Sequence, residues 1–187
     1  MASPPVELAG IPLHPLLADH RSPPGFDPSG EVVSQELAAL LEAARWAPSH
    51  RNSQPWRFVV GRRDDRTHQR VLAALPVADR SWAGPAPVLL VAAHLTRSES
   101  GGELPHARYD LGQAVAHLCL QAAALGLAVH QLTDVDPAVL QAALGLPAAT
   151  RPVVVIAVGR PVGPPGQPSE PAHPPATRHP VGLLLLG

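Results

Sequence analysis

Lysine is absent from this 187-residue sequence, and all 14 of its basic side chains are arginine. Without a lysine amine the chain cannot carry out Schiff-base or pyridoxal chemistry, and it cannot form a phosphate-binding loop that requires lysine. The single cysteine, Cys119, excludes a disulfide scaffold and any metal site built from several cysteines. The net charge of −1 lacks the basic surplus that nucleic-acid binding requires.

Long hydrophobic runs are also missing. The longest apolar tracts, such as Val88–Ala93 and Val153–Val158, are too short to cross a bilayer. Four prolines interrupt the first 20 residues, which carry no basic region followed by an apolar run. We therefore expect a cytoplasmic protein of one domain, with neither nucleic acid nor membrane as a partner.

Helical and extended patterns alternate along the chain without an internal repeat. Apolar residues at helical spacing predict helices over residues 14–20, 34–47, 63–75, 104–125 and 136–145. Ser34 is expected to cap the second of these helices, and Asp136 followed by Pro137 the last. Apolar runs predict strands over residues 56–60, 87–93, 128–132 and 152–158.

The C-terminal region differs in composition from the rest of the chain. Eight of the 24 prolines lie within residues 159–180, so this segment is expected to be an extended arm. Residues 181–186 then resume an apolar, strand-like pattern. This strand could fold back on its own sheet, but a partner subunit's sheet explains the long arm better.

Histidines are numerous enough to raise the possibility of a metal site. Of the ten, His106 and His117 share one predicted helix with Asp110. Asp110 and His117 are two turns apart, about 10 Å along the axis, which is too far for one ion. Because no His-Glu-x-x-His motif occurs either, we expect no metal. A serine-hydrolase elbow and a Gly-x-Gly-x-x-Gly nucleotide motif are also missing from the sequence.

One polar loop stands out between the second helix and the first strand. Residues 49–54 place six polar side chains between Pro48 and Pro55. Amides and hydroxyls both donate and accept hydrogen bonds, so such a loop can bind the polar edge of a planar heterocycle. The alternative is an ordinary capped connection into a strand.

This loop lies within a longer segment that resembles a known signature. Residues 44–60 read Ala-Arg-Trp-Ala-Pro-Ser-His-Arg-Asn-Ser-Gln-Pro-Trp-Arg-Phe-Val-Val. They are similar to the Ala-Pro-Ser-x-x-Asn-x-Gln-Pro-Trp signature of the FMN-dependent nitroreductase family. A second similar block covers residues 109–117 and 124–131. Together with weaker similarities elsewhere, the matches run in the family's order and cover most of residues 14–182.

The resemblance implies an α+β fold, a nitroreductase-like sandwich with a central mixed sheet flanked by helices. It implies a homodimer with one FMN at each of two subunit interfaces. Residues 1–160 would form the FMN-binding domain. Residues 161–187 would form the proline-rich arm and a terminal strand exchanged with the partner subunit, as part of the same domain.

The resemblance also implies which side chains contact FMN. His20, Arg21 and Ser22 correspond to the segment that binds the FMN phosphate, and Arg178 to a second phosphate contact. The isoalloxazine or ribityl would meet the loop residues, and a strand end would lie along one ring face. The loop set is Ser49, His50, Asn52 and Gln54, and the strand-end set is Gln131, Leu132 and Thr133.

The implied activity is transfer of a hydride from NADH or NADPH to FMN and then to an electron-poor acceptor. Nitroaromatics, quinones and enals are the implied acceptors, used in a ping-pong reaction in one shared cleft. Because the flavin performs this chemistry, no catalytic side chain is expected. The loop over residues 96–103 is short where larger members carry a helical excursion, which predicts an open site.

Four positions depart from the family pattern and keep two other functions open. Pro24, Asp79, Trp82 and Asp134 stand where relatives often carry a basic residue, asparagine, lysine and glycine. A cation near the flavin stabilises its reduced form, so these departures are compatible with a flavin-binding sensor or storage protein without turnover. A small α/β interaction module with a proline-rich strap is the third possibility.

Overall fold

A computed structural model describes residues 12–18, 22–23, 25–162 and 178–185. Its centre is one four-stranded sheet in the order β1-β2-β4-β3, formed by β1 (Trp56–Arg62), β2 (Val88–Leu95), β3 (Ala128–Leu132) and β4 (Thr150–Gly159). Every neighbouring pair is antiparallel. The expected mixed sheet is therefore wrong for the described residues, because each strand lies beside one that runs in the opposite direction.

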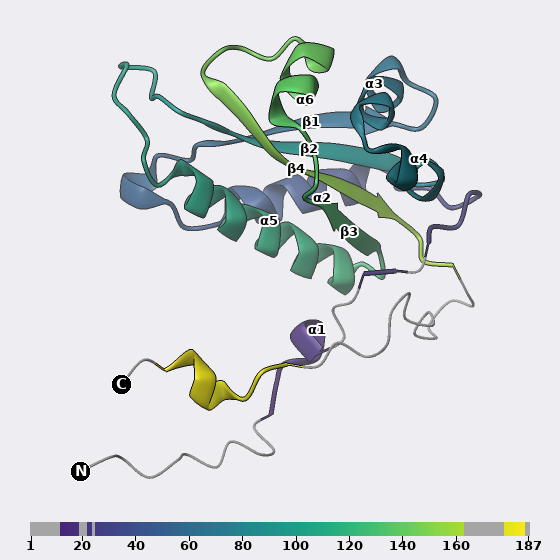
Figure 1. Cartoon of the computed structure of the whole chain (residues 1–187). Helices are drawn as coiled ribbons and strands as arrows, with labels where there is room; N and C mark the ends of the chain where they lie inside the picture. The colour runs from purple at the N-terminus through teal and green to yellow at the C-terminus, as the bar shows by residue number, and fades with distance from the viewer. Residues whose placement is uncertain (1–11, 19–21, 24, 163–177, 186–187) are drawn as a thin grey trace.

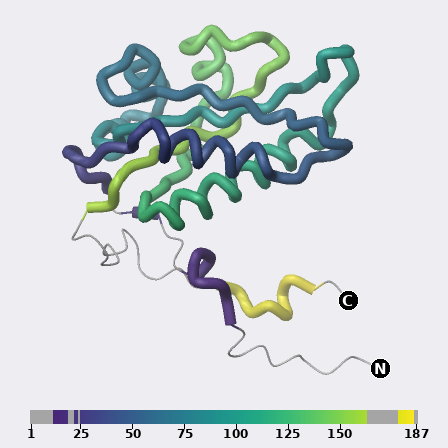
Figure 2. The backbone as a smooth tube through the Cα atoms, turned by 180° about the vertical axis from the view of Figure 1, so that it is seen from behind, coloured from purple at the N-terminus to yellow at the C-terminus, as the bar shows by residue number. Residues whose placement is uncertain are grey.

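Helices cover both faces of the sheet (Figures 1 and 2). One face packs against α2 (Ser34–Arg45) and α5 (Ala107–Ala124), and the other against α3 (Arg66–Ala74) and α6 (Pro137–Leu144). The α+β sandwich is thus confirmed. Shorter elements are α1 (Pro15–Ala18), α4 (Val77–Ala83) and the 3₁₀ turns η1 (His50–Asn52) and η2 (Val181–Leu184).

Strand β2 shows why the sheet lies inside the molecule. Its Val88 and Leu90 belong to the core cluster beneath α2 and α5, while Leu89 and Val91 belong to the cluster beneath α3 and α6. A strand buried on both faces has to be a continuous apolar run, which is the pattern in the sequence. The two helical layers therefore bury residues 88–93 of β2, while His94 and Leu95 at its end are half-buried.

Two helix starts were predicted from capping residues, with different outcomes. Helix α6 begins as expected, since the Asp136 carboxylate accepts the Ala138 N–H at 2.8 Å. Helix α2 begins at Ser34 itself, after Val33, whose N–H donates to Glu36 Oε2 at 3.0 Å. Val33 therefore occupies the cap position and Ser34 does not. The side chain of Glu36 satisfies the free N–H of Val33.

The C-terminal residues depart from the expected strand. Val181–Leu184 form η2, in which the Leu183 N–H donates to the Pro180 carbonyl at 2.9 Å. A strand forms only beside another strand, and no strand of the described sheet pairs with this segment. Most of the proline-rich arm (163–177) lies outside the described residues, so its exchange between subunits stays a prediction.

Helix α4 has no counterpart among the predicted elements. It begins after Pro76, which restricts the backbone before the first turn, and its buried face is a single residue, Ala83. A helix of seven residues with one buried position carries almost no periodic signal. Across the described residues, the helices are too short or too polar to cross a bilayer.

Candidate active site

The polar loop at residues 49–54 has an unusual backbone. Arg51, Asn52 and Gln54 have φ values of 52°, 56° and 44°, in the left-handed region that glycine occupies more readily than other residues. Each such residue costs free energy, on the order of 1 kcal/mol, and persists only where surrounding contacts hold it. Three such residues therefore concentrate this backbone cost in the short connection between α2 and β1.

Hydrogen bonds within the loop and to its neighbour Arg57 hold this conformation. Ser49 Oγ accepts the Gln54 N–H at 3.0 Å, and the His50 carbonyl accepts the Ser53 N–H at 3.1 Å. At the end of the loop, Arg57 donates to the Gln54 carbonyl at 3.2 Å. The side chains of His50, Asn52 and Gln54 remain exposed. The loop therefore satisfies much of its backbone internally and presents polar side chains at the surface.

Helix α5 supplies a buried carboxylate to the same loop. Asp110 is 2% exposed, and its Oδ2 accepts the His50 N–H at 3.1 Å. The His106 ring lies against the His50 ring, with 4.6 Å between centroids. The contact between Asp110 and the loop is not visible in the sequence, because 60 residues separate the two. Among the described residues, no cluster of three potential metal ligands occurs.

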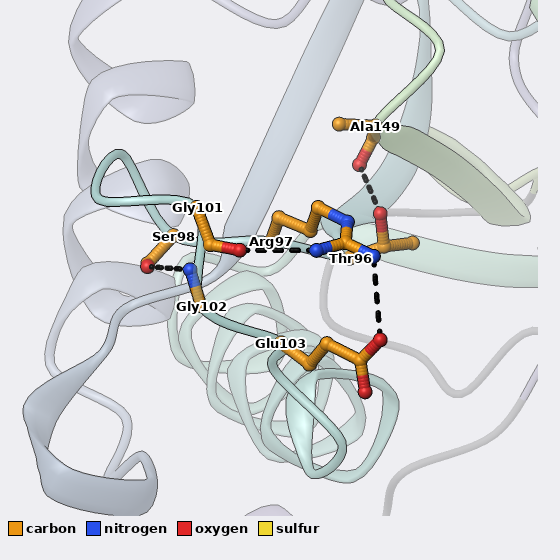
Figure 3. Close-up of polar contacts among 7 residues, drawn as sticks. All are labelled: Thr96, Arg97, Ser98, Gly101, Gly102, Glu103 and Ala149. Carbon is orange, nitrogen blue, oxygen red and sulfur yellow. Dashed lines mark hydrogen bonds and ion pairs between the residues drawn. The ribbon is translucent and has the colours of Figure 1, made fainter.

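A short hairpin after β2 borders this end of the sheet (Figure 3). Ser98 Oγ accepts the Gly102 N–H at 3.1 Å, and Arg97 forms an ion pair with Glu103 at 3.3 Å. Thr96 Oγ1 ties the hairpin to the Ala149 carbonyl at 3.2 Å. The preceding residue, Leu95, donates its N–H to Pro55 at 2.9 Å, so the hairpin and the polar loop are joined at their bases. The rim of the site is thus compact on this side.

The residues expected at the strand end lie at the opposite edge of the sheet from the polar loop. Gln131, Leu132 and Thr133 come at the end of β3, which is one edge of the sheet, whereas the polar loop leads into β1 at the other edge. Three strand spacings, about 14 Å, separate these edges. Leu132 is buried, while Gln131 and Thr133 are exposed. One chain alone therefore does not bring the two sets together.

The expected phosphate-binding residues are only partly described. Ser22 and Arg178 are both exposed, whereas His20 and Arg21 lie outside the described residues. Arg178 precedes η2, which Figure 1 shows near α1, away from the sheet. Their joint role in binding a phosphate therefore stays a prediction.

Trp82 occupies a packed position where a lysine is expected in some relatives. Its ring lies 5.5 Å from that of Phe26 and 4.2 Å from that of His130, both edge to face. Such aromatic pairs stabilise packing. Trp82 therefore joins α4 to β3 through an aromatic contact and supplies no cation there.

An apolar groove lies on the opposite side of the α2/α5 layer from the sheet. Its volume is about 540 Å³, and its lining includes Leu16, Trp46 and Leu120. Trp46 is 72% exposed, and its indole N–H donates to Glu42 at 2.8 Å. Hydrogen bonds from Arg45 and Trp46 lower the pKa of Glu42 to about 2. The indole is thus held in place while most of its surface faces solvent.

The only cysteine is expected to be chemically inert in the folded protein. Burial raises the pKa of Cys119 to about 11, against a smaller opposing hydrogen bond from Gln131 Nε2 at 3.4 Å. At pH 8 the reactive thiolate is therefore scarce as well as shielded. We expect alkylation by iodoacetamide to be at least tenfold slower than in urea-unfolded protein. Equal rates in mass-spectrometric time courses would contradict this burial.

Comparisons with known proteins define the class of this α+β fold. A solved structure described as an oxidoreductase containing FMN superposes with a TM-score of 0.84 at 28% identity, covering 100% of this chain and 96% of that chain. The nitroreductase family model matches residues 17–160. The chain belongs to the nitroreductase family, as the sequence resemblance predicted.

Curated relatives carry more than one activity in their names. An oxygen-insensitive NADPH nitroreductase of Helicobacter pylori is 35% identical over 94 residues, which are 50% of this chain and 42% of that protein. A 5,6-dimethylbenzimidazole synthase of Rhodospirillum rubrum is 32% identical over 156 residues, covering 70% of this chain and 73% of that protein. The chain spans less than half the length of the first curated relatives it matches.

Proposed function

We propose that this protein is an FMN-dependent oxidoreductase that takes a hydride from NADH or NADPH and passes it to an electron-poor acceptor. The observation that carries this proposal is the polar loop at 49–54, held in a strained conformation at the end of the sheet. Support comes from the FMN named for the similar structure and the NADPH named for a relative.

The chemistry of the loop suits a flavin. Asn52 and Gln54 carry amides that both donate and accept, and their side chains are exposed. These groups can match the alternating donors and acceptors of an isoalloxazine edge or the ribityl hydroxyls. Ser22 and Arg178 would hold the phosphate, since a guanidinium makes charge-assisted hydrogen bonds to phosphate oxygens. The residues present therefore fit FMN.

The roles of the protein side chains are to bind, orient and shield. FMN, when bound, supplies the hydride transfer. The Ser49–Gln54 hydrogen bond fixes the loop before a ligand arrives, which reduces the ordering cost of binding. A hairpin as short as 96–103 would leave the site open to planar acceptors such as nitroaromatics, quinones or enals, used in a ping-pong reaction.

The proposed active unit is a homodimer. The loop and the end of β3 lie at opposite edges of the sheet. A site that contains both sets of residues would therefore need the loop of one copy and the β3 end of a second copy. The outward surface of α5 supports this, since Tyr109 is 72% exposed and Leu120 lines the apolar groove. An apolar surface of this kind is typical of subunit interfaces.

The proposal predicts a coloured protein. Purified protein supplied with FMN is expected to show a visible flavin spectrum that NADH or NADPH bleaches under anaerobic conditions. Addition of a quinone or nitroaromatic should restore the colour. Protein that takes up no FMN on titration would overturn the flavin assignment.

The same experiment decides the second candidate, a flavin-binding protein without turnover. This candidate is favoured by Trp82, which packs against Phe26 and His130 and offers no cation to a reduced flavin. Bound FMN that neither NADH nor NADPH bleaches would support it and would exclude the oxidoreductase.

A further inference from the structure

We propose that Asp110 is a positioning residue, which holds the polar loop in the conformation that receives FMN. This inference rests on the proposed function, because the loop is the proposed flavin contact. Asp110 lies on the buried face of α5 beside Ala107, Leu111 and Ala114. A carboxylate on an otherwise apolar face is costly unless hydrogen bonds compensate for its lost hydration.

Two features of the structure stabilise this buried carboxylate. Asp110 lies in the first turn of the 18-residue helix α5, where the helix dipole favours a negative charge. Its Oδ2 accepts the His50 backbone N–H at 3.1 Å. This hydrogen bond joins Asp110 to a residue 60 positions earlier in the chain, so it restrains the loop rather than the helix. Asp110 thus joins α5 to η1.

The hydrogen bond from His50 to Asp110 lies where it can restrain the backbone of the loop. His50 is the first residue of η1, immediately before Arg51 and Asn52, which have left-handed backbones. Fixing the amide of His50 restrains the chain at the point where the unfavourable conformation begins. The His106 ring, 4.6 Å from the His50 ring, adds a second contact from the N-terminal end of α5.

Removing the carboxylate should therefore release the loop without unfolding the protein. In Asp110→Ala the loop can relax toward ordinary backbone angles, and FMN binding then has to restore the strained conformation. We expect the dissociation constant for FMN, measured by quenching of flavin fluorescence, to rise about tenfold or more. Asp110→Asn keeps an acceptor oxygen for the His50 N–H, so it should bind FMN within about threefold of the unaltered protein.

A matched control separates positioning from general loss of stability. His68 is also buried, and its Nε2 bonds the Ala86 carbonyl at 3.0 Å, beneath α3 on the other face of the sheet. His68→Ala should lower the melting temperature and leave the FMN dissociation constant unchanged. If Asp110→Ala does not fold, Asp110→Leu, which keeps the branched shape of the side chain without an acceptor, takes its place.

Hydrogen exchange of the loop amides provides a readout independent of flavin. Amides of residues 49–54 should exchange at least tenfold faster in Asp110→Ala than in the unaltered protein or in Asp110→Asn. A folded Asp110→Ala protein with unchanged loop exchange and unchanged FMN affinity would overturn the positioning role. If the unaltered protein binds no FMN, the proposed function fails, and the exchange rates alone decide whether Asp110 positions the loop.

Discussion

Replacing Leu118 with alanine is expected to lower the free energy of unfolding by about 3 kcal/mol. Leu118 is fully buried at the centre of α5, between α2 and the sheet. Truncation removes its apolar contacts and leaves a cavity that the surrounding strands and helices can fill only in part. For a chain of this length the melting temperature should fall by roughly 6–12 °C. Urea unfolding followed by circular dichroism, at one fixed protein concentration, measures the loss.

The control for this prediction lies on the same helix. Arg108 is exposed, so Arg108→Ala should change the free energy of unfolding by less than about 0.5 kcal/mol. A loss below about 1 kcal/mol in Leu118→Ala would show that α5 does not pack as described. The pair of variants therefore tests the core beneath the proposed site rather than the helix propensity of α5.

Replacing Leu120 with arginine is expected to convert the proposed dimer into monomers. Leu120 lines the apolar groove on the outer side of α5, only two positions from Leu118 but directed away from the core. A guanidinium placed in this largely apolar interface loses its hydration, which costs several kcal/mol. We expect the dimer dissociation constant to rise about 100-fold or more. Analytical ultracentrifugation over a range of concentrations measures this change.

Flavin content should fall together with the dimer, because the proposed site needs the polar loop of one copy and the β3 end of the other. Gln69→Arg places the same charge on the exposed side of α3, across the sheet, and should leave both the dimer and its flavin unchanged. If Leu120→Arg remained dimeric and loaded with FMN, the groove would not be the subunit interface.

Some helices and strands could be predicted from the sequence, and others could not. Strand β3 was predicted with its observed ends, and α6 with its Asp136 cap, because both patterns depend on neighbours in the sequence. Helix α4 was missed because one buried residue gives no periodicity. The terminal strand was wrong for the described residues, since apolar composition cannot provide a strand with a partner.

The polar loop could also be predicted only in part. Its residues were identified from a local signature, since prolines and polar side chains at close spacing are visible in the sequence. Its left-handed backbone and its contact with Asp110 were not visible, because that contact joins positions 60 residues apart. In the sequence, Asp110 could be compared only with His106 and His117 on its own helix. In the structure, its hydrogen-bond partner is the polar loop.

The sequence by itself determined the chemistry available to this protein and the local elements that carry it. With no lysine and one cysteine, several mechanisms were excluded, and the periodicity of apolar residues defined most helices and strands. Tertiary structure alone decided the antiparallel strand order, the separation of loop and β3 end on opposite sheet edges, and the burial of Asp110 beneath the loop. These depend on contacts between distant segments, which form only when the two apolar faces of the sheet are covered by helices.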